Sequence, residues 1–391
     1  MHISVRRSGL LGISRKLARL LPGQSPIADL TGILMEADEN DGSLRLVATN
    51  LEVTLQYRIP AIVAEGGRMV VNGKLLASMI PLLSDDQVIF RSKTNSAIAR
   101  IENGRAIFEI SCLSGSHYPE SEIAPPGSMA TIHGLASLAG QTAFSATKKA
   151  KFIDDMLANA KLEISPSELR MTCTDGVKLA IARRKREADS ETEPTSMQLL
   201  IPTKSLPLIS DVCGDEAVSV GISGTTLVFS GANYRYSTRT MAGIYPDTNA
   251  LLAQIKPAYS AIVEAAAFWA ELDRLSVMAE PGDTVRLSMG ENGIALSYQQ
   301  EHVAFSSMAD AVVYTPTPDS GFHYGVNDLF RTLRYMEGNL SVVIDHIGNM
   351  LLKTRELCYL ITPRRQRKAA VKPEDKNKES KPKTTRRKKV A

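Results

Sequence analysis

The chain has 391 residues, of which 43% are apolar and 23% are charged. This composition is typical of a globular protein, and the length predicts two or three domains. The sequence has no run of about 18 apolar residues, as a membrane helix needs, and its N-terminus lacks the features of a signal peptide. We therefore expect a cytoplasmic protein with no membrane contact.

The first predicted element is an amphipathic helix over about residues 8–21. Its apolar side chains fall on one stripe and two basic side chains fall on the opposite face: Leu10, Ile13, Leu17, Leu20 and Leu21 against Arg15 and Arg19. Residues 44–60, LRLVATNLEVTLQYRIP, then predict two strands joined at Thr49-Asn50. Further on, residues 68–83 predict a strand that runs into a short helix, and GRAIFEIS at 104–111 predicts an edge strand.

The same order of elements then recurs along the chain. Thr174-Asp175 stands 125 residues after Thr49-Asn50, and another 125 residues lead to Gln299-Gln300 inside IALSYQQEHVAFSSM. Tyr118-Pro119 likewise recurs as Tyr245-Pro246, 127 residues on. A period near 125 is the size of a domain and is too long for a solenoid repeat.

Each copy contains a helix, a strand pair around a polar turn, a strand passing into a second helix, and further alternating strands. The later strand-to-helix segments are QLLIPTKSLPLISDV at 198–212 and FHYGVNDLFRTLRYM at 322–336. Strands grouped around helices without regular alternation predict an α+β fold with antiparallel sheets. We predict three repeated domains at residues 1–127, 128–254 and 255–365.

A basic tail follows the third copy. Residues 364–391 hold 13 Lys/Arg and three Asp/Glu, a local net charge of +10, which leaves −6 on the preceding 363 residues. Its composition predicts that residues 366–391 are disordered, because they cannot bury enough apolar surface to offset chain entropy. Such a tail is typical of an electrostatic arm for nucleic acid, and the alternative is a solubilising segment.

Metal and catalytic motifs are not found in the sequence. The four cysteines, at 112, 173, 213 and 358, include no C-x-x-C pair and predict buried thiols in a reducing compartment. The sequence has no P-loop, G-x-S-x-G or H-E-x-x-H. Asp154-Asp155 and Asp175 are the best case for an enzyme, but Asp175-Gly176 between two strands is sufficiently explained as a turn. We expect no catalysis, no metal and no cofactor.

Several of these phrases together resemble the bacterial DNA polymerase III beta subunit family, the DNA sliding clamps. The matching phrases are LVATNLEV, ELRMTCTDGVKLAIARRK, LLIPTKSLPLI, GIYPD and CYLITPRR, and the resemblance covers about residues 1–365 in order. It implies a ring-shaped, head-to-tail homodimer with two helices per domain inside and antiparallel sheets outside. It also implies a processivity factor for DNA replication, which encircles duplex DNA without reading its sequence.

The resemblance implies which residues face DNA and the neighbouring subunit. A body of net charge −6 would repel DNA unless its basic residues gathered on one surface. The residues expected to face DNA are Arg15, Arg19, Lys74, Lys148, Lys149, Lys151, Lys204, Arg331 and Arg334. Those expected at the dimer interface are Ala106, Phe108, Ile110, Val277 and Met278. The alternatives are solvated basic faces and ordinary core positions.

The resemblance further implies a groove that binds short apolar peptides of the DNA polymerase and clamp loader. Its expected residues are Leu157, Thr174, Gly176, Lys178, Leu179, Pro246, Leu360, Ile361, Thr362 and Pro363.

This chain departs from the family pattern in the groove. The family usually has His-Arg at Val177-Lys178, a basic residue at Ala250, an Asn at Gly325 and Met-Pro-Met at 362–364. These departures predict a different peptide preference. They also leave open a divergent clamp-like scaffold that binds nucleic acid mainly through its basic tail.

Overall fold

The computed structural model describes residues 1–93, 97–119, 126–147, 156–186, 196–241 and 243–364. Within these residues, the chain forms three units of the same construction, one after another. Each unit contains two four-stranded sets of antiparallel strands and a pair of helices. The tail at 366–391, and the three predicted DNA-facing lysines at 148, 149 and 151, lie outside the described residues.

The first set of strands in each unit has one order, β1-β7-β8-β9, β10-β15-β16-β17 and β18-β24-β25-β26. In the first unit these strands are β1 His2–Arg6, β7 Gln87–Arg91, β8 Ile98–Asn103 and β9 Ala106–Leu113. In the second they are β10 Met129–Ile132, β15 Val218–Ser223, β16 Thr226–Ser230 and β17 Tyr234–Arg239. In the third they are β18 Tyr259–Glu264, β24 Asn339–Ile344, β25 Met350–Lys353 and β26 Leu357–Ile361.

The second set has the orders β6-β2-β3-β4, β14-β11-β12-β13 and β23-β19-β20-β21. In the first unit this second set consists of β2 Gly32–Asp38, β3 Ser43–Thr49, β4 Val53–Pro60 and β6 Gly67–Asn72. The second unit has β11 Asn159–Ile164, β12 Glu168–Thr174, β13 Lys178–Lys185 and β14 Met197–Pro202. The third unit has β19 Thr284–Gly290, β20 Gly293–Gln299, β21 Ala304–Ala309 and β23 Phe322–Gly325. Two further strands extend the first sets: β5 Ile62–Glu65 pairs with β1, and β22 Ala311–Thr315 pairs with β18.

The helices pack in pairs, one pair in each unit. The pairs are α1 Arg7–Leu20 with α2 Gly73–Met79, α3 Leu135–Thr142 with α4 Leu206–Cys213, and α6 Ala265–Ser276 with α7 Val326–Leu333. A further helix, α5 Thr248–Ala253, connects the second and third units, and short 3₁₀ turns lie at Ala28–Thr31, Ile80–Leu82, Ala143–Ser145, Met156–Ala158 and Thr203–Ser205. No helix in the described part of the chain is long and apolar enough to span a membrane.

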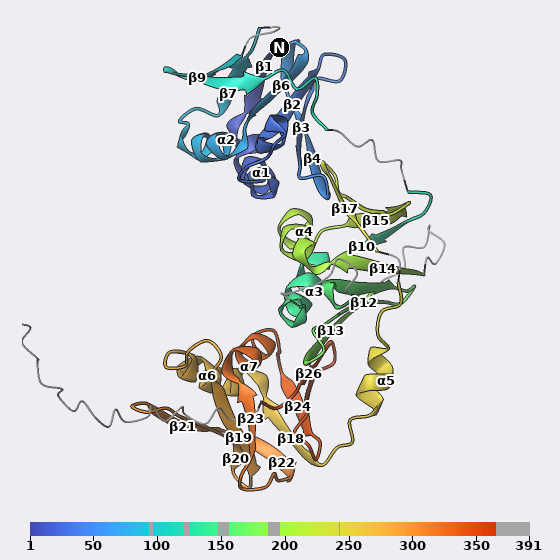
Figure 1. Cartoon of the computed structure of the whole chain (residues 1–391), viewed down its shortest axis with the longest axis vertical. Coiled ribbons are helices and arrows are strands. Elements are labelled where there is room, and N and C mark those ends of the chain that lie inside the picture. The colour runs from blue at the N-terminus through green and yellow to red at the C-terminus, as the bar shows by residue number, and fades with distance from the viewer. Residues whose placement is uncertain (94–96, 120–125, 148–155, 187–195, 242, 365–391) are drawn as a thin grey trace, which may run out of the picture.

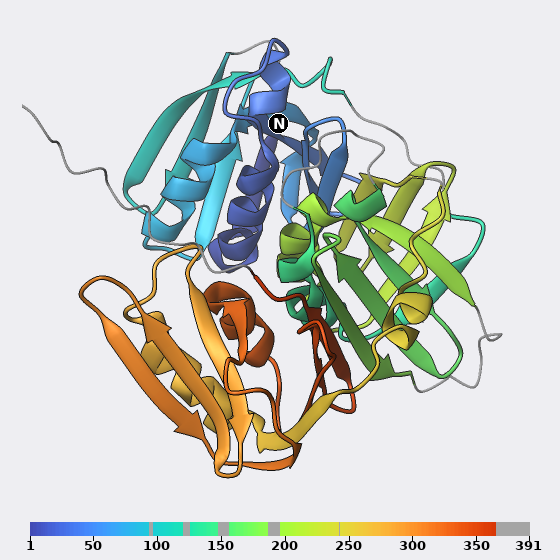
Figure 2. The ribbon, with the colours of Figure 1, turned by 60° about the horizontal axis from the view of Figure 1, so that its bottom comes forward.

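The helix α1 confirms the sequence pattern. Leu10, Leu17, Leu20 and Leu21 are buried, whereas Arg15 is exposed on the opposite face. The apolar stripe packs on the strands of the first unit and against α2, so burial of one face stabilises a helix whose first turn has no side-chain cap. Figure 2 shows α1 and α2 side by side in this unit.

The repeated Thr-Asx phrase forms the same turn in the first two units. The Thr49 hydroxyl accepts a hydrogen bond from the Leu51 N–H at 3.1 Å and donates one to the Val53 carbonyl at 3.0 Å. The Thr174 hydroxyl makes the equivalent bonds to Gly176 and Lys178, at 3.1 and 2.8 Å. The turn therefore recurs because the hydroxyl satisfies one N–H of the turn and gives a second hydrogen bond to the carbonyl that also accepts the Asx N–H.

Sheets continue across both boundaries between units. Strand β4 of the first unit pairs with β17 of the second, with Tyr57 opposite Tyr234. Strand β13 of the second unit pairs with β26 of the third, with Leu179 opposite Leu360. In both cases the strand that follows the Thr-Asx turn pairs with the last strand of the next unit.

The segments that connect the units cover outer faces of these sheets. Tyr118 is buried with Leu34, Val47 and Val70, and its hydroxyl donates to the Val47 carbonyl at 3.2 Å. After the second unit, the side chains of Leu252 and Ile255 pack on a buried cluster of Leu179, Ile181, Cys358 and Leu360. Figure 1 shows the result, a crescent with the paired helices along its concave side and α5 on its convex side.

Candidate functional site

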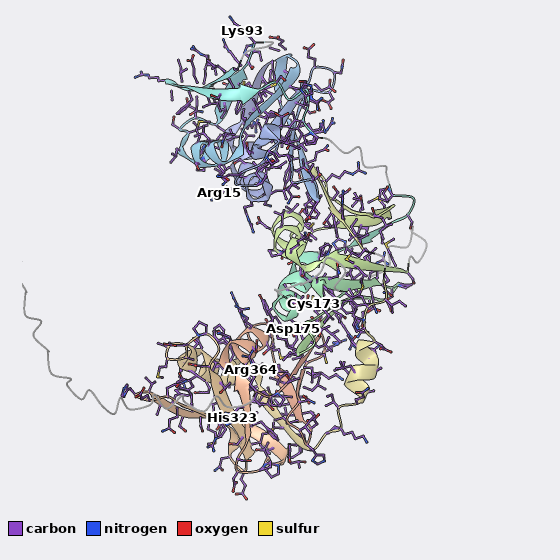
Figure 3. The ribbon with its side chains drawn as sticks, viewed as in Figure 1. Arg15, Lys93, Cys173, Asp175, His323 and Arg364 are labelled. Atoms are coloured by element: carbon purple, nitrogen blue, oxygen red, sulfur yellow. The ribbon has the colours of Figure 1, made fainter. Side chains whose placement is uncertain are left out.

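Basic side chains predicted to face DNA lie on the helices of the concave side. Arg15 is exposed on α1 (Figure 3), and Lys74, Arg331 and Arg334 are exposed on or next to α2 and α7. Arg19 is also exposed, but its Nη1 lies 2.6 Å from the Asp211 Oδ2 on α4.

Lys204 is exposed and pairs with Glu52 across the first boundary between units. Arg19 and Lys204 therefore join the first and second units as well as contributing positive charge. Because exposed ion pairs are each worth only about 0–1 kcal/mol, neither pair holds its cation firmly.

A pocket of about 370 Å³ lies where α3 and α4 approach α7. Arg331, Arg334 and Tyr335 line one side, and Phe144 and Pro207 are among the residues on the other. The guanidinium of Arg334 lies 5.9 Å from the centre of the Tyr335 ring, within the range of a cation–π contact. The concave side thus presents two positive charges at the boundary between the second and third units.

The predicted peptide groove falls at the same boundary, around the β12–β13 turn. The Thr174 side chain is fixed by its turn bonds, and an added Cβ on Gly176 would lie 3.8 Å from Leu157. The Lys178 Nζ lies 2.6 Å from the Asp175 Oδ2 and 3.7 Å from Oδ1 of Asp328 on α7. The Asp175 carboxylate also accepts the N–H groups of its own turn, at 3.0 and 2.9 Å.

The remaining predicted groove residues divide by exposure. Leu179, Leu360 and Ile361 are buried, the first two in the cluster covered by the segment that contains α5. Pro246 is exposed at the start of that segment, whereas Thr362 and Pro363 are half-buried after β26. The structure therefore brings these residues to one boundary, with some forming its core and others its surface.

The predicted interface residues lie on two separate ends of the crescent. Ala106, Phe108 and Ile110 belong to β9, which pairs with β6 only through Cys112 and Leu113. Phe108 and Ile110 are half-buried against their own core. At the other end, Val277 is 85% exposed and Met278 is 40% exposed after α6.

Two features were missed by sequence reasoning. Strand β21 ends the four-stranded sheet of the third unit, and Asp328 contacts both Lys178 and Arg364. The period of 125 residues placed the third copy of the strand-turn-strand phrase over β21, the equivalent of β4 and β13, but did not show that β21 lies at the edge of a sheet. Nothing in the sequence pattern joins Asp328 to Arg364, because the contact depends on the path of the chain after β26.

All four cysteines are described; they are buried, as predicted, and none forms a disulfide. Burial raises the pKa of Cys173 to about 12 and that of Cys213 to about 11, so neither thiol is poised as a nucleophile. Among the described residues, His, Cys, Asp and Glu side chains form no group that could hold a metal ion. Asp154 and Asp155 lie outside those residues.

Comparison with known proteins identifies the family. Residues 1–122 match the N-terminal domain of the DNA polymerase III beta subunit, and residues 131–247 match its central domain. The beta sliding clamp of Streptomyces coelicolor is 29% identical over 307 residues, which cover 76% of this chain and 78% of that protein. This chain belongs to the beta sliding clamp family. The Bacillus subtilis beta sliding clamp is 25% identical over 303 residues, covering 74% of this chain and 78% of that protein.

Solved structures confirm the predicted sliding-clamp fold. A crystal structure of the Bacillus subtilis DNA polymerase sliding clamp superposes with a TM-score of 0.81 at 21% identity, over 94% of this chain and 100% of that one. A putative DNA polymerase III beta subunit from Eubacterium rectale gives a TM-score of 0.82 at 19% identity, over 93% and 99% of the two chains. The predicted α+β fold of repeated clamp-type domains is therefore correct, with strands outside and paired helices inside.

Proposed function

We propose that this sliding clamp closes as a head-to-tail homodimeric ring around duplex DNA and tethers the replicative DNA polymerase to it. The observation that carries the proposal is the crescent of three similar units with cations on its concave helices. Two such crescents joined end to end would enclose a central hole. The domain boundaries proposed for each subunit are 1–127, 128–254 and 255–365.

The pairing between units suggests how the ring closes. Inside the chain, β4 pairs with β17 and β13 pairs with β26. The strand equivalent to β4 and β13 in the third unit is β21, and the strand equivalent to β17 and β26 in the first unit is β9. We infer that β21 of one subunit pairs with β9 of the next, so that one kind of contact is repeated around the ring.

Side chains near both strands support this inference. Ile107 on β9 is 55% exposed and Met308 on β21 is 46% exposed. Val277 and Met278 lie next to this end of the third unit, beyond α6, which packs on β21. β9 pairs with β8 and β21 pairs with β20, so each strand keeps one edge that is open over most of its length within the described residues. Large apolar side chains exposed at two such edges are a typical sign of an interface. Ala106, Phe108 and Ile110 would contribute from the first unit.

The net charge supports encirclement over tight binding at one site. The 363 residues before the tail carry −6, so the basic residues of the concave helices are a local exception. Such a surface can contact phosphates without reading bases and lets a ring slide. We propose that Arg15, Arg19, Lys74, Lys204, Arg331 and Arg334 face DNA, together with the lysines at 148, 149 and 151.

A matched pair of variants tests this face. The double variant Arg15→Glu/Arg334→Glu should load poorly on nicked DNA, because it reverses two charges on the concave side. The control Lys93→Glu/Lys256→Glu makes the same change of net charge, with Lys93 far from the concave helices in Figure 3 and Lys256 just after α5. Equal loading of the two variants at equal salt would contradict the assignment.

We further propose that the groove between the second and third units tethers partners. Polymerase and clamp loader subunits would insert short apolar peptides near Leu157, Gly176 and Pro246. The residues at this boundary combine apolar side chains with polar handles, as a peptide site requires. The buried Leu179, Leu360 and Ile361 would support its floor.

We infer that the chain itself performs no catalysis and works in the cytoplasm. The strongest candidate for an acid, Asp175, is occupied by its turn and by Lys178. A carboxylate held in this way is a structural element and is not free to serve as a general base. A processivity subunit would act by retaining the polymerase on DNA, and the four buried cysteines suit a reducing compartment.

A further inference from the structure

Four charged side chains form a line of ion pairs across the boundary between the second and third units. Lys178 lies between Asp175 of its own unit and Asp328 of the third, and Asp328 also accepts a hydrogen bond from Arg364. Asp175, Lys178 and Asp328 are each less than a fifth exposed at the side chain, whereas Arg364 is 41% exposed. Arg364 is therefore the member of the line that a partner can reach.

The position of Arg364 is fixed by the backbone around it. Its N–H donates to the His323 carbonyl at 2.7 Å, which ties the segment after β26 to β23. An added Cβ on Gly325 would lie 3.0 Å from both the Cζ and Nε atoms of Arg364 and 2.8 Å from the Asp328 Oδ2. The absence of a side chain at Gly325 therefore lets the guanidinium lie against the start of α7.

Arg364 retains hydrogen-bonding capacity toward solvent. A guanidinium has five N–H donors, and the side-chain hydrogen bond of Arg364 within the described residues goes to Asp328 alone. The Asp328 carboxylate, in turn, has Lys178 on its other oxygen. The two acids and two bases balance in charge, so the outermost group of the line presents a positive charge with free donors.

Exposed apolar side chains lie on segments that contact the residues just before Arg364. Val177 is 53% exposed, and its carbonyl accepts the N–H of Thr362 at 3.3 Å, two residues before Arg364. Ile347 is 73% exposed and precedes Gly348, where an added Cβ would lie 3.1 Å from Pro363.

Ile244 extends this apolar surface on the side of the second unit. It is 93% exposed and follows Gly243, where an added Cβ would lie 2.6 Å from the sulfur of Met156. Met156 precedes Leu157 of the predicted groove. Val177 and Ile347 thus lie on segments that contact residues 362 and 363, just before Arg364, and Ile244 lies beside Met156 at the predicted groove. Each of these three apolar side chains is more than half exposed.

We propose that Arg364 is a specificity-determining residue that selects partner peptides carrying a carboxylate beside their apolar side chains. This inference rests on the proposed tethering groove and adds the chemistry of its ligand. The apolar side chains of the peptide would cover Val177, Ile244 and Ile347, and its carboxylate would accept hydrogen bonds from Arg364. A basic peptide residue would instead meet the one exposed charge of the line, which has the same sign.

The experiment measures binding of two labelled short peptides to the full-length protein by fluorescence anisotropy. Both contain leucine and phenylalanine anchors and differ only by Asp or Asn between them. The wild-type protein should bind the Asp peptide about three- to tenfold more tightly, as expected for a partly exposed charge pair. Added salt should narrow this difference.

Variants assign the preference to one side chain. Arg364→Gln should bind both peptides with equal affinity, and Arg364→Lys should keep part of the preference for the Asp peptide. The control Arg355→Gln, on the exposed β25–β26 turn, should keep the whole preference. The inference would be overturned if the wild-type protein bound the two peptides equally, or if Arg364→Gln kept the full preference for the Asp peptide. Either result would leave the proposal of a tethering groove intact. Failure of both peptides to bind the wild-type protein would overturn the tethering proposal as well.

Discussion

At the scale of single residues, a threonine hydroxyl holds the turn that repeats along the chain. Thr49 is 2% exposed, and its hydroxyl bonds to the Leu51 N–H and the Val53 carbonyl. Thr49→Val keeps the shape but leaves the Leu51 N–H without its partner and removes one of the two hydrogen bonds to the Val53 carbonyl, which keeps the Asn50 N–H. We therefore expect a loss of about 1–3 kcal/mol in the free energy of unfolding. Urea denaturation followed by circular dichroism measures this loss.

The matched control is Thr49→Ser, which keeps the hydroxyl and should lose much less stability. An equal loss in the two variants would contradict the special role of the hydroxyl, because Ser keeps the hydroxyl and loses only the methyl group. The same comparison at Thr174 should give the same ranking, because its two bonds have nearly the same lengths.

At the scale of elements, α3 begins without a side chain that could cap it. Gly134 occupies the N-cap position, and Asp215, which follows α4, accepts the Ser137 N–H at 3.0 Å and the Ser137 hydroxyl at 2.7 Å. Burial raises the pKa of Asp215, but the two hydrogen bonds from Ser137 and the positive charge of Arg184 together outweigh it and hold the pKa below its ordinary value of 3.8. Asp215 therefore stabilises α3 only while its carboxyl is ionised.

This cap gives a prediction that depends on pH. Asp215→Ala should cost about 1 kcal/mol of stability at pH 7. Because the pKa of Asp215 is lower in the folded state, its contribution to stability is complete when the pH is above its pKa in the unfolded state. That contribution is lost as the pH falls through its pKa in the folded state. The difference between wild type and variant, measured by urea denaturation, should thus shrink below about pH 4. The control is Asp319→Ala, a change at an exposed residue that should cost no stability at any pH. If the stability difference between wild type and Asp215→Ala stayed constant with pH, Asp215 would not act as an ionised cap.

The sequence predicted elements whose pattern is local and missed those that depend on long-range pairing. The stripe of α1 and the Thr-Asx turns appear as spacings of a few residues, so their positions could be predicted closely. The role of Tyr118 in the first connecting segment could not be predicted, because it depends on which sheet face the segment crosses. Gly325 was recognised as unusual, but its consequence required the position of Arg364.

At the scale of the whole molecule, the open edges of β9 and β21 at the two ends should determine the oligomeric state. Val277→Asp places a charge where an 85% exposed apolar side chain is proposed to contact the next subunit. We expect the dimer dissociation constant to rise about tenfold or more, since burying an unpaired charge costs over 1 kcal/mol. Sedimentation velocity over a range of protein concentrations measures it.

The control for this variant is Val312→Asp on β22, where the wild-type side chain is 61% exposed and outside the proposed contact. It should dimerise as the wild type does. If both variants dimerise equally well, the head-to-tail contact between β21 and β9 is assigned to the wrong end of the third unit.

The central claim is that the protein is held on DNA by encircling it. The most direct measurement is retention on a nicked circular plasmid and on the same plasmid linearised, at high salt, after loading with a clamp loader has been verified at low salt. Topological linkage predicts retention on the circle and loss from the free ends of the linear form. Equal loss from both at high salt would contradict the claim and would favour a scaffold that binds nucleic acid electrostatically through its basic tail.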